Sequence, residues 1–125
     1  MKKILAVDAV GCLVDLNGNI DNHIFKIINK YKNRKIVLTN ANDEEKKIFL
    51  KNISYEIFSL KHNPEKTNPI YYEKFLSEYN IKAENVIYFE HNIKAVKSAR
   101  LNNITTHHYD GIIDNLNIFL KKNLD

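Results

Sequence analysis

Short runs typical of buried strands alternate along this chain with amphipathic segments, and this alternation restricts the fold more than any other feature. The strand-like runs are residues 4–7, 36–38, 55–60, 86–89 and 104–109. The segments between them repeat apolar residues every three or four positions, as amphipathic helices do. Strands that alternate with helices about five times predict an α/β domain with a mainly parallel, five-stranded sheet.

Residues that commonly cap helices stand before the predicted helical segments. We expect helix N-caps at Asp21, at Asn42 or Asp43, at Asn68 with Pro69 as the first helical residue, and at Asp110 or Asp114. Among the apolar residues of the helices, we expect Ile48, Phe49 and Leu101 to face the core.

Composition narrows the class of protein. The chain has 125 residues, 44% of them hydrophobic and 27% charged, which predicts a single globular domain over residues 1–125. Its apolar runs are too short for a membrane span or a signal peptide. The single cysteine, Cys12, cannot form an internal disulfide, which fits a reducing cytoplasm. The net charge of +4 comes from scattered lysines, so we expect neither a nucleic-acid nor a membrane partner.

Polar residues follow the predicted strands at the edge where parallel sheets bind ligands. They are Asp8, then Thr39 and Asn40, then Glu90 and His91, with Lys66 shortly before the helix at Pro69. A carboxylate can attack phosphorus, a hydroxyl and a lysine can hold phosphoryl oxygens, and a second acid can help to hold a cation. These residue types together predict a phosphoryl site.

Four segments, in this order, resemble the motifs of the haloacid dehalogenase (HAD) superfamily, whose members are mostly phosphatases. Residues 4–13, ILAVDAVGCL, are similar to its apolar strand followed by Asp-x-Asp-Gly-Thr-Leu, and residues 37–40, VLTN, to its second strand. Residues 66–73, KTNPIYYE, resemble Lys-Pro-Asp-Pro-x-x-Tyr-Glu, and residues 86–91, VIYFEH, resemble a strand ending in Asp-Asp. The resemblance implies a Rossmann-like, three-layer domain. The short segments between the motifs imply that the cap domain of larger members is missing.

The resemblance also implies roles for individual residues. Asp8 would be the nucleophile, assisted by Lys66, and the phosphate would be bound by Thr39, Asn40 and Lys66. A divalent metal would be held by Asp8, the main-chain carbonyl of Val10, Glu90 and His91. The implied ion is Mg²⁺, although the imidazole of His91 favours Mn²⁺ or Zn²⁺.

The chain departs from the family pattern at three places. Val10 stands where the family has the carboxylate that serves as general acid and base, a loss that typically costs about 10²–10⁴-fold in rate. The loss matters most for sugar and alkyl phosphates, whose leaving oxygen needs a proton. The acidic pair of the fourth motif is replaced by Glu90 and His91, and Cys12 replaces the usual threonine. We do not expect Cys12 to be a nucleophile, because the sequence has neither an adjacent histidine nor a Cys-x5-Arg loop.

Three functions are compatible with these features. The first is a weak or specialised phosphatase that acts on a small phosphorylated molecule or a phosphoprotein. The second is a catalytically degenerate relative that binds a phosphorylated ligand or a protein partner without turnover. With either function, the chain could form a homo-oligomer. The third is a receiver domain, which is disfavoured because residues 58–60 and 107–109 lack the acceptor aspartate and the lysine that it needs.

Structural roles for the same residues remain open at this point. Lys66 could be an ordinary surface lysine, since Lys61 is also close enough in sequence to be the motif lysine. Thr39 and Asn40 could cap the next helix. His91 is equally compatible with a capping role. His107 and His108 are adjacent on a strand, so they face opposite sides and we expect them to be structural.

Overall fold

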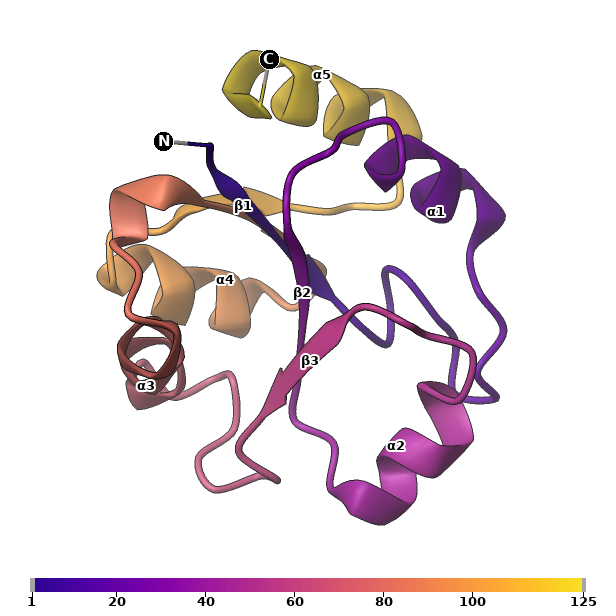
Figure 1. Ribbon diagram of the computed structural model, residues 1–125, viewed down its shortest axis with the longest axis vertical. Helices are drawn as coiled ribbons and strands as arrows, with labels where there is room; N and C mark the ends of the chain where they lie inside the picture. The colour runs from indigo at the N-terminus through magenta and orange to yellow at the C-terminus, as the bar shows by residue number, and fades with distance from the viewer. Residues whose placement is uncertain (1, 125) are drawn as a thin grey trace.

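The computed structural model describes residues 2–124, which form a parallel sheet of five strands (Figure 1). The strands are β1 (Ile4–Asp8), β2 (Lys35–Thr39), β3 (Glu56–Ser59), β4 (Val86–Glu90) and β5 (Thr105–His108). Their order in the sheet is β3-β2-β1-β4-β5, and every neighbouring pair is parallel. Strand β1 is therefore central.

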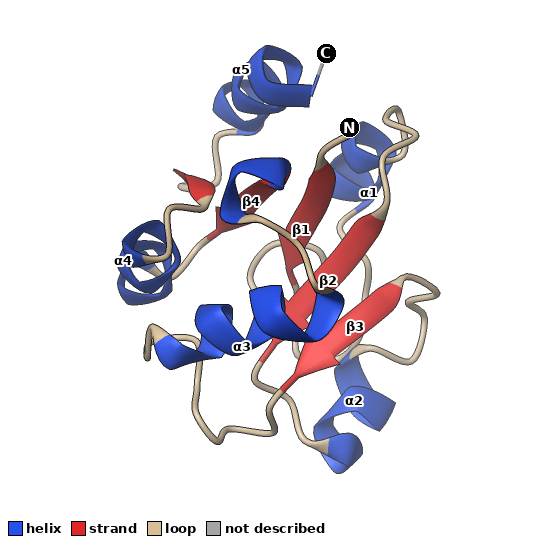
Figure 2. Cartoon of the chain, turned by 60° about the vertical axis from the view of Figure 1, so that its left-hand side comes forward, coloured by secondary structure: helices blue, strands red, loops and turns tan. Residues whose placement is uncertain are grey.

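Helices cover both faces of this sheet, as Figures 1 and 2 show. They are α1 (Asn22–Ile28), α2 (Asp43–Phe49), α3 (Ile70–Tyr79), α4 (Ile93–Leu101) and α5 (Ile113–Leu124), with a short 3-10 helix at Ala83–Asn85. Helices α1 and α5 pack on one face and α3 and α4 on the other, each with its own apolar cluster. The expected Rossmann-like, three-layer fold is confirmed.

The central strand shows why the apolar runs are continuous. All five residues of β1 are buried. Leu5 and Val7 pack in the cluster below α1 and α5, whereas Ile4 and Ala6 pack in the cluster below α3 and α4. A strand that is covered on both faces needs apolar side chains at successive positions, because neighbours point to opposite faces.

Local capping signals place two of the helices as expected. The carboxylate of Asp21 accepts hydrogen bonds from the main chain at the start of α1. Asn42 caps α2 in a capping box with Glu45. Helix α3 begins at Ile70, one residue later than expected. Pro69 nevertheless has helical backbone angles, and the Asn68 side chain accepts a hydrogen bond from the peptide N–H of Ile70, as a cap at Asn68 would. Asp114 lies inside α5 and is not its cap.

Two apolar residues expected in the core are exposed instead. Ile48 is 55% exposed, because α2 lies beyond the edge of the sheet and none of its residues, all described, is fully buried. Phe49 is only partly buried. Leu101 is 72% exposed, since it lies on the side of α4 opposite the buried Val96 and Ala99.

In the part of the chain that the structure describes, none of the helices has both the length and the apolar character needed to cross a membrane.

Candidate functional site

The carboxyl ends of the central strands open into one pocket of about 220 Å³. Strands β1, β2 and β4 each contribute the residues at or just beyond their ends, and the loop before α3 contributes Lys66. Every residue that the sequence assigned to the site lines this pocket: Asp8, Val10, Thr39, Asn40, Lys66, Glu90 and His91.

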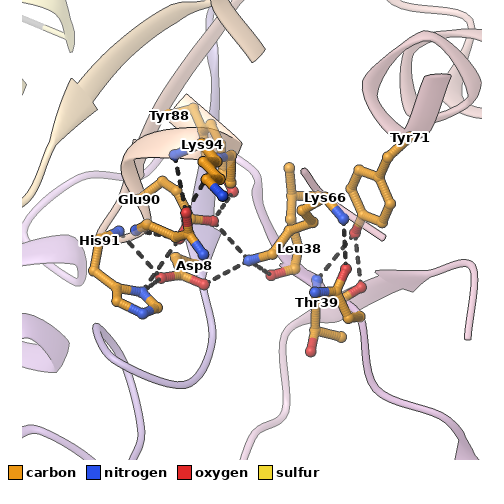
Figure 3. A network of polar contacts seen from close by, with 12 residues as sticks. Asp8, Leu38, Thr39, Lys66, Tyr71, Tyr88, Glu90, His91 and Lys94 are labelled. Atoms are coloured by element: carbon orange, nitrogen blue, oxygen red, sulfur yellow. Dashed lines mark hydrogen bonds and ion pairs between the residues drawn. The ribbon is translucent and has the colours of Figure 1, made fainter. Parts of the chain in front are cut away.

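At the floor of the pocket, two buried carboxylates are bridged by two cationic side chains (Figure 3). Lys66 Nζ lies 2.6 Å from Asp8 Oδ1 and 2.7 Å from Glu90 Oε1. On the other side, His91 Nδ1 lies 2.5 Å from Asp8 Oδ2 and 3.2 Å from Glu90 Oε2. Each carboxylate therefore gives one oxygen to each cation.

Lys66 is fully engaged inside the protein. Its ammonium group donates to the two carboxylates and to the carbonyl of Leu38, 3.2 Å away. Burial lowers the pKa of Lys66, but the charges of Asp8 and Glu90 reverse this effect and hold it well above its usual value. Lys61, the competing lysine, is exposed and pairs with Asp43. The three N–H bonds of Lys66 are thus directed to the protein, not to the pocket.

The two carboxylates differ in their electrostatics. Burial raises the pKa of Asp8, and the neighbouring lysine counteracts it only in part. Burial also acts to raise the pKa of Glu90, but the charge of Lys66 and hydrogen bonds from its neighbours outweigh it and hold this pKa below its usual range. Glu90 therefore stays ionised at the centre of the cluster.

His91 is held as a cation at the pocket's edge. Hydrogen bonds to Asp8 and then to Glu90 raise the pKa of His91 to about 10. Its ring lies against Gly11, and its peptide N–H donates to Asp8 Oδ2 at 3.3 Å. A plain capping role is excluded, because Asn92 caps α4.

Thr39 and Asn40 occupy the opposite wall. Asn40 Oδ1 accepts a hydrogen bond from the peptide N–H of Lys66, and Thr39 Oγ1 accepts one from that of Ala41. Because Asn42 caps α2, neither residue caps the next helix. The hydroxyl proton of Thr39 and the amide N–H bonds of Asn40 suit phosphoryl oxygens as acceptors.

Two departures from the family pattern also lie at this site. Val10 lines the pocket beside Asp8, where an isopropyl group has no proton to transfer. Cys12 is buried, and burial together with the charges of Asp8 and Glu90 raises the pKa of its thiol far above the usual value. This thiol is not a nucleophile at neutral pH.

The Mg²⁺ ion that the fold family implies does not fit the side chains present. Mg²⁺ requires oxygen ligands in close octahedral geometry, yet the oxygens of Asp8 and Glu90 already face Lys66 and His91. Among the described residues, Asp8, Cys12 and His91 bring possible ligand atoms within 4.8 Å of one another. Such a set of oxygen, sulfur and nitrogen suits a softer ion.

Sequence reasoning missed the tyrosines that support the cluster. Tyr88 donates a hydrogen bond to Glu90 Oε1 at 2.5 Å, and Tyr72 lies 3.1 Å from the Tyr88 hydroxyl. Residues two apart on a strand share a face, so the position of Tyr88 before Glu90 was a usable signal. The partnership with Tyr72 depends on how α3 packs and had no local signal.

The rim of the pocket combines charge with apolar surface. His62 contacts Glu45 at 2.5 Å and Glu65 at 2.7 Å. Leu16 and Phe49 contribute apolar surface to the lining. His62 and Glu45 line the pocket together with these two residues.

Comparison with known proteins finds matches among solved structures. No protein-family model and no curated protein matches the chain. The core domain of a phosphoglycolate phosphatase-like protein from Streptococcus pneumoniae aligns with 95% of this chain and 96% of its own, at 17% identity and a TM-score of 0.63. A HAD family enzyme from Bacteroides thetaiotaomicron, solved with magnesium and inorganic phosphate, aligns with 90% of this chain and 96% of its own, at 13% identity and a TM-score of 0.67.

An uncharacterised protein from Corynebacterium glutamicum aligns with 97% of this chain and 94% of its own, at 12% identity and a TM-score of 0.71. In two further neighbours, the chain spans 46% of the length. At these identities the likeness establishes the fold, which is that of the HAD-superfamily hydrolases.

Proposed function

We propose that this chain is a slow phosphatase of the HAD type that transfers a phosphoryl group to Asp8. One observation carries the proposal: Asp8 ends the central strand at the floor of the pocket, opposite Thr39 and Asn40 and next to Lys66. The fold, which is shared with phosphatases, supports the same function.

The chemistry uses residues of this chain alone. A carboxylate oxygen of Asp8 attacks phosphorus, and the bond to the leaving oxygen breaks with its electron pair. The Thr39 hydroxyl and the Asn40 amide donate to the phosphoryl oxygens. Water then attacks the phosphorus of the aspartyl phosphate, which breaks the bond to Asp8 and releases phosphate.

Val10 sets the preference for the substrate. Since it offers no proton, the leaving oxygen must depart without general acid catalysis. Acyl and aryl phosphates tolerate this because their leaving groups are weak bases. We therefore propose a substrate of that class, either a small molecule or a phosphoprotein. The second step also lacks a base at position 10, so the aspartyl phosphate should accumulate.

The test is phosphate release from acetyl phosphate, p-nitrophenyl phosphate and a set of sugar phosphates. We expect release from the first two to exceed that from the sugars and to vanish in Asp8→Asn. Asp114→Asn, on the exposed side of α5, is the matched control and should retain the wild-type rate. Equal release from Asp8→Asn and wild type, with both proteins folded, would refute the proposal.

A second function is favoured by a specific observation. Both oxygens of Asp8 and the ammonium group of Lys66 are engaged within the protein. This arrangement suits a protein that binds a phosphorylated ligand without turnover. Calorimetric binding of inorganic phosphate, without release from any of the substrates above, would identify this function.

A further inference from the structure

The ring of His91 lies between the two carboxylates to which the family pattern assigns a metal ion. Its Nδ1 contacts Asp8 Oδ2 at 2.5 Å and Glu90 Oε2 at 3.2 Å, while Lys66 contacts the remaining oxygen of each acid (Figure 3). All four carboxylate oxygens thus face a cationic side chain. A metal ion could reach these oxygens only by displacing the ring.

Both acids are buried and already engaged. Lys66 donates to one oxygen of each acid, and His91 Nδ1 contacts the other oxygen of each. A divalent cation would have to replace these contacts to bind the acids, and a buried acid that loses its partners is costly.

The surroundings of His91 fit the ring in this place. A Cβ atom at Gly11 would lie 2.5 Å from Nδ1 and 2.6 Å from Cε1, so the ring occupies the space that a side chain at position 11 would need. The main-chain carbonyl of His91 lies 2.9 Å from Nε2 of His108, which belongs to the neighbouring strand β5. This contact holds the main chain at His91 in place. The side chain is nevertheless 46% exposed, so part of the ring faces the pocket.

We propose that the His91 ring takes the place of the divalent metal between Asp8 and Glu90, so that this site binds a phosphoryl group without Mg²⁺. The ring contacts both carboxylates through Nδ1, and its other nitrogen, Nε2, can form a hydrogen bond with a phosphoryl oxygen. The part of this proposal that concerns the phosphoryl ligand rests on the proposed function. The part that concerns the metal does not.

Metal binding tests the proposal without any assay of activity. In calorimetric titrations with Mn²⁺ alone, we expect the wild type to bind at least about tenfold more weakly than His91→Ala, because removal of the ring frees one oxygen of each acid for the ion. The gain should disappear in the double variant His91→Ala, Asp8→Asn. His23→Ala, which removes an exposed histidine of α1, should behave as wild type.

Circular dichroism must show that His91→Ala is folded, and His91→Gln replaces it if it is not. A wild type that binds one Mn²⁺, with loss of binding in Asp8→Asn, would overturn the proposal. A folded His91 variant without the gain would overturn it as well. The proposal would also be refuted if the wild type bound Zn²⁺ and both Cys12→Ser and His91→Ala lost this binding. His91 would then be a metal ligand.

Binding of inorganic phosphate provides the second test. We expect the same affinity of the wild type in EDTA and in Mg²⁺, whereas His91→Ala should require Mg²⁺. A wild type that binds phosphate only with Mg²⁺ would overturn the inference. Phosphate that binds under neither condition would contradict the proposed function, while the Mn²⁺ titration would still decide the role of His91.

Discussion

The wall of the pocket beside Asp8 carries the alkyl side chain of Val10. We expect Val10→Asp to raise phosphate release from a sugar phosphate by about tenfold or more, because general acid catalysis contributes about 10²–10⁴-fold where it is present. Val10→Asn has nearly the same size but no proton to transfer at neutral pH, so it should keep the wild-type rate. Steady-state kinetics of both variants check this, and equal rates would contradict it.

The pH response of the pocket rim depends on His62. Hydrogen bonds to Glu45 and then to Glu65 raise the pKa of His62 above its usual value of 6.5. The stabilisation of the fold by these ion pairs is therefore fully present below pH 6.5 and is lost as the pH rises through the raised pKa. This stabilisation is small, because these groups are largely exposed.

An NMR titration of the His62 ring should give a midpoint above 6.5. The midpoint should fall in Glu45→Gln, which keeps an oxygen for the capping box of α2. Glu44→Gln, on the exposed side of the same helix, is the control and should leave it unchanged. An identical midpoint in Glu45→Gln and wild type would show that the contact does not persist in solution.

At the scale of secondary structure elements, the features that depend on nearby residues could be predicted better than those that depend on packing. The caps at Asp21 and Asn42 could be predicted because a cap bonds the main chain within three residues. The exposure of Ile48 and Leu101 could not, since it depends on where the helix lies against the sheet. The strands were predicted to within one residue at each end. For β1 and β4 the reason is that strands buried on both faces have continuous apolar sequences.

Tyr71 connects α3 to the strand that carries Thr39. Its hydroxyl accepts a hydrogen bond from the peptide N–H of Thr39 at 3.0 Å and lies 2.9 Å from the carbonyls of Thr39 and Phe58. Tyr71→Phe leaves these buried groups with fewer partners, so we expect a loss of about 1–3 kcal/mol in the free energy of unfolding. Urea denaturation measures it. Tyr109→Phe, which changes a partly buried tyrosine, is the control, and its free energy of unfolding should stay within about 0.5 kcal/mol of the wild-type value.

Across the whole molecule, the site depends on contacts between distant parts of the sequence. The pair formed by Lys66 and Asp8 spans 58 residues, and the pair formed by His91 and Asp8 spans 83. The sequence predicted which residues reach the pocket, because parallel strands end at one edge. It could not predict which cation contacts which oxygen, since that follows from side-chain packing across the completed sheet.

Lys66→Met tests how far global stability depends on this cluster. The substitution leaves two buried carboxylates with less compensation, so we expect a loss of about 3–5 kcal/mol in the free energy of unfolding. Adding Glu90→Gln should recover part of it. Lys61→Met removes an exposed ion pair with Asp43 and should cost about 0–1 kcal/mol. Similar losses in the two lysine variants would contradict the importance of the buried cluster.

The close approach of Gly11 to the His91 ring also limits how this sequence can change. A Cβ atom at position 11 would collide with the ring, and the φ of +96° at Gly11 would strain any residue with a side chain even after the histidine is lost. Position 91 can therefore change while Gly11 stays, whereas a change at position 11 is unfavourable with or without His91. A mutational path between this chain and a metal-dependent relative is expected to keep Gly11 and to change position 91.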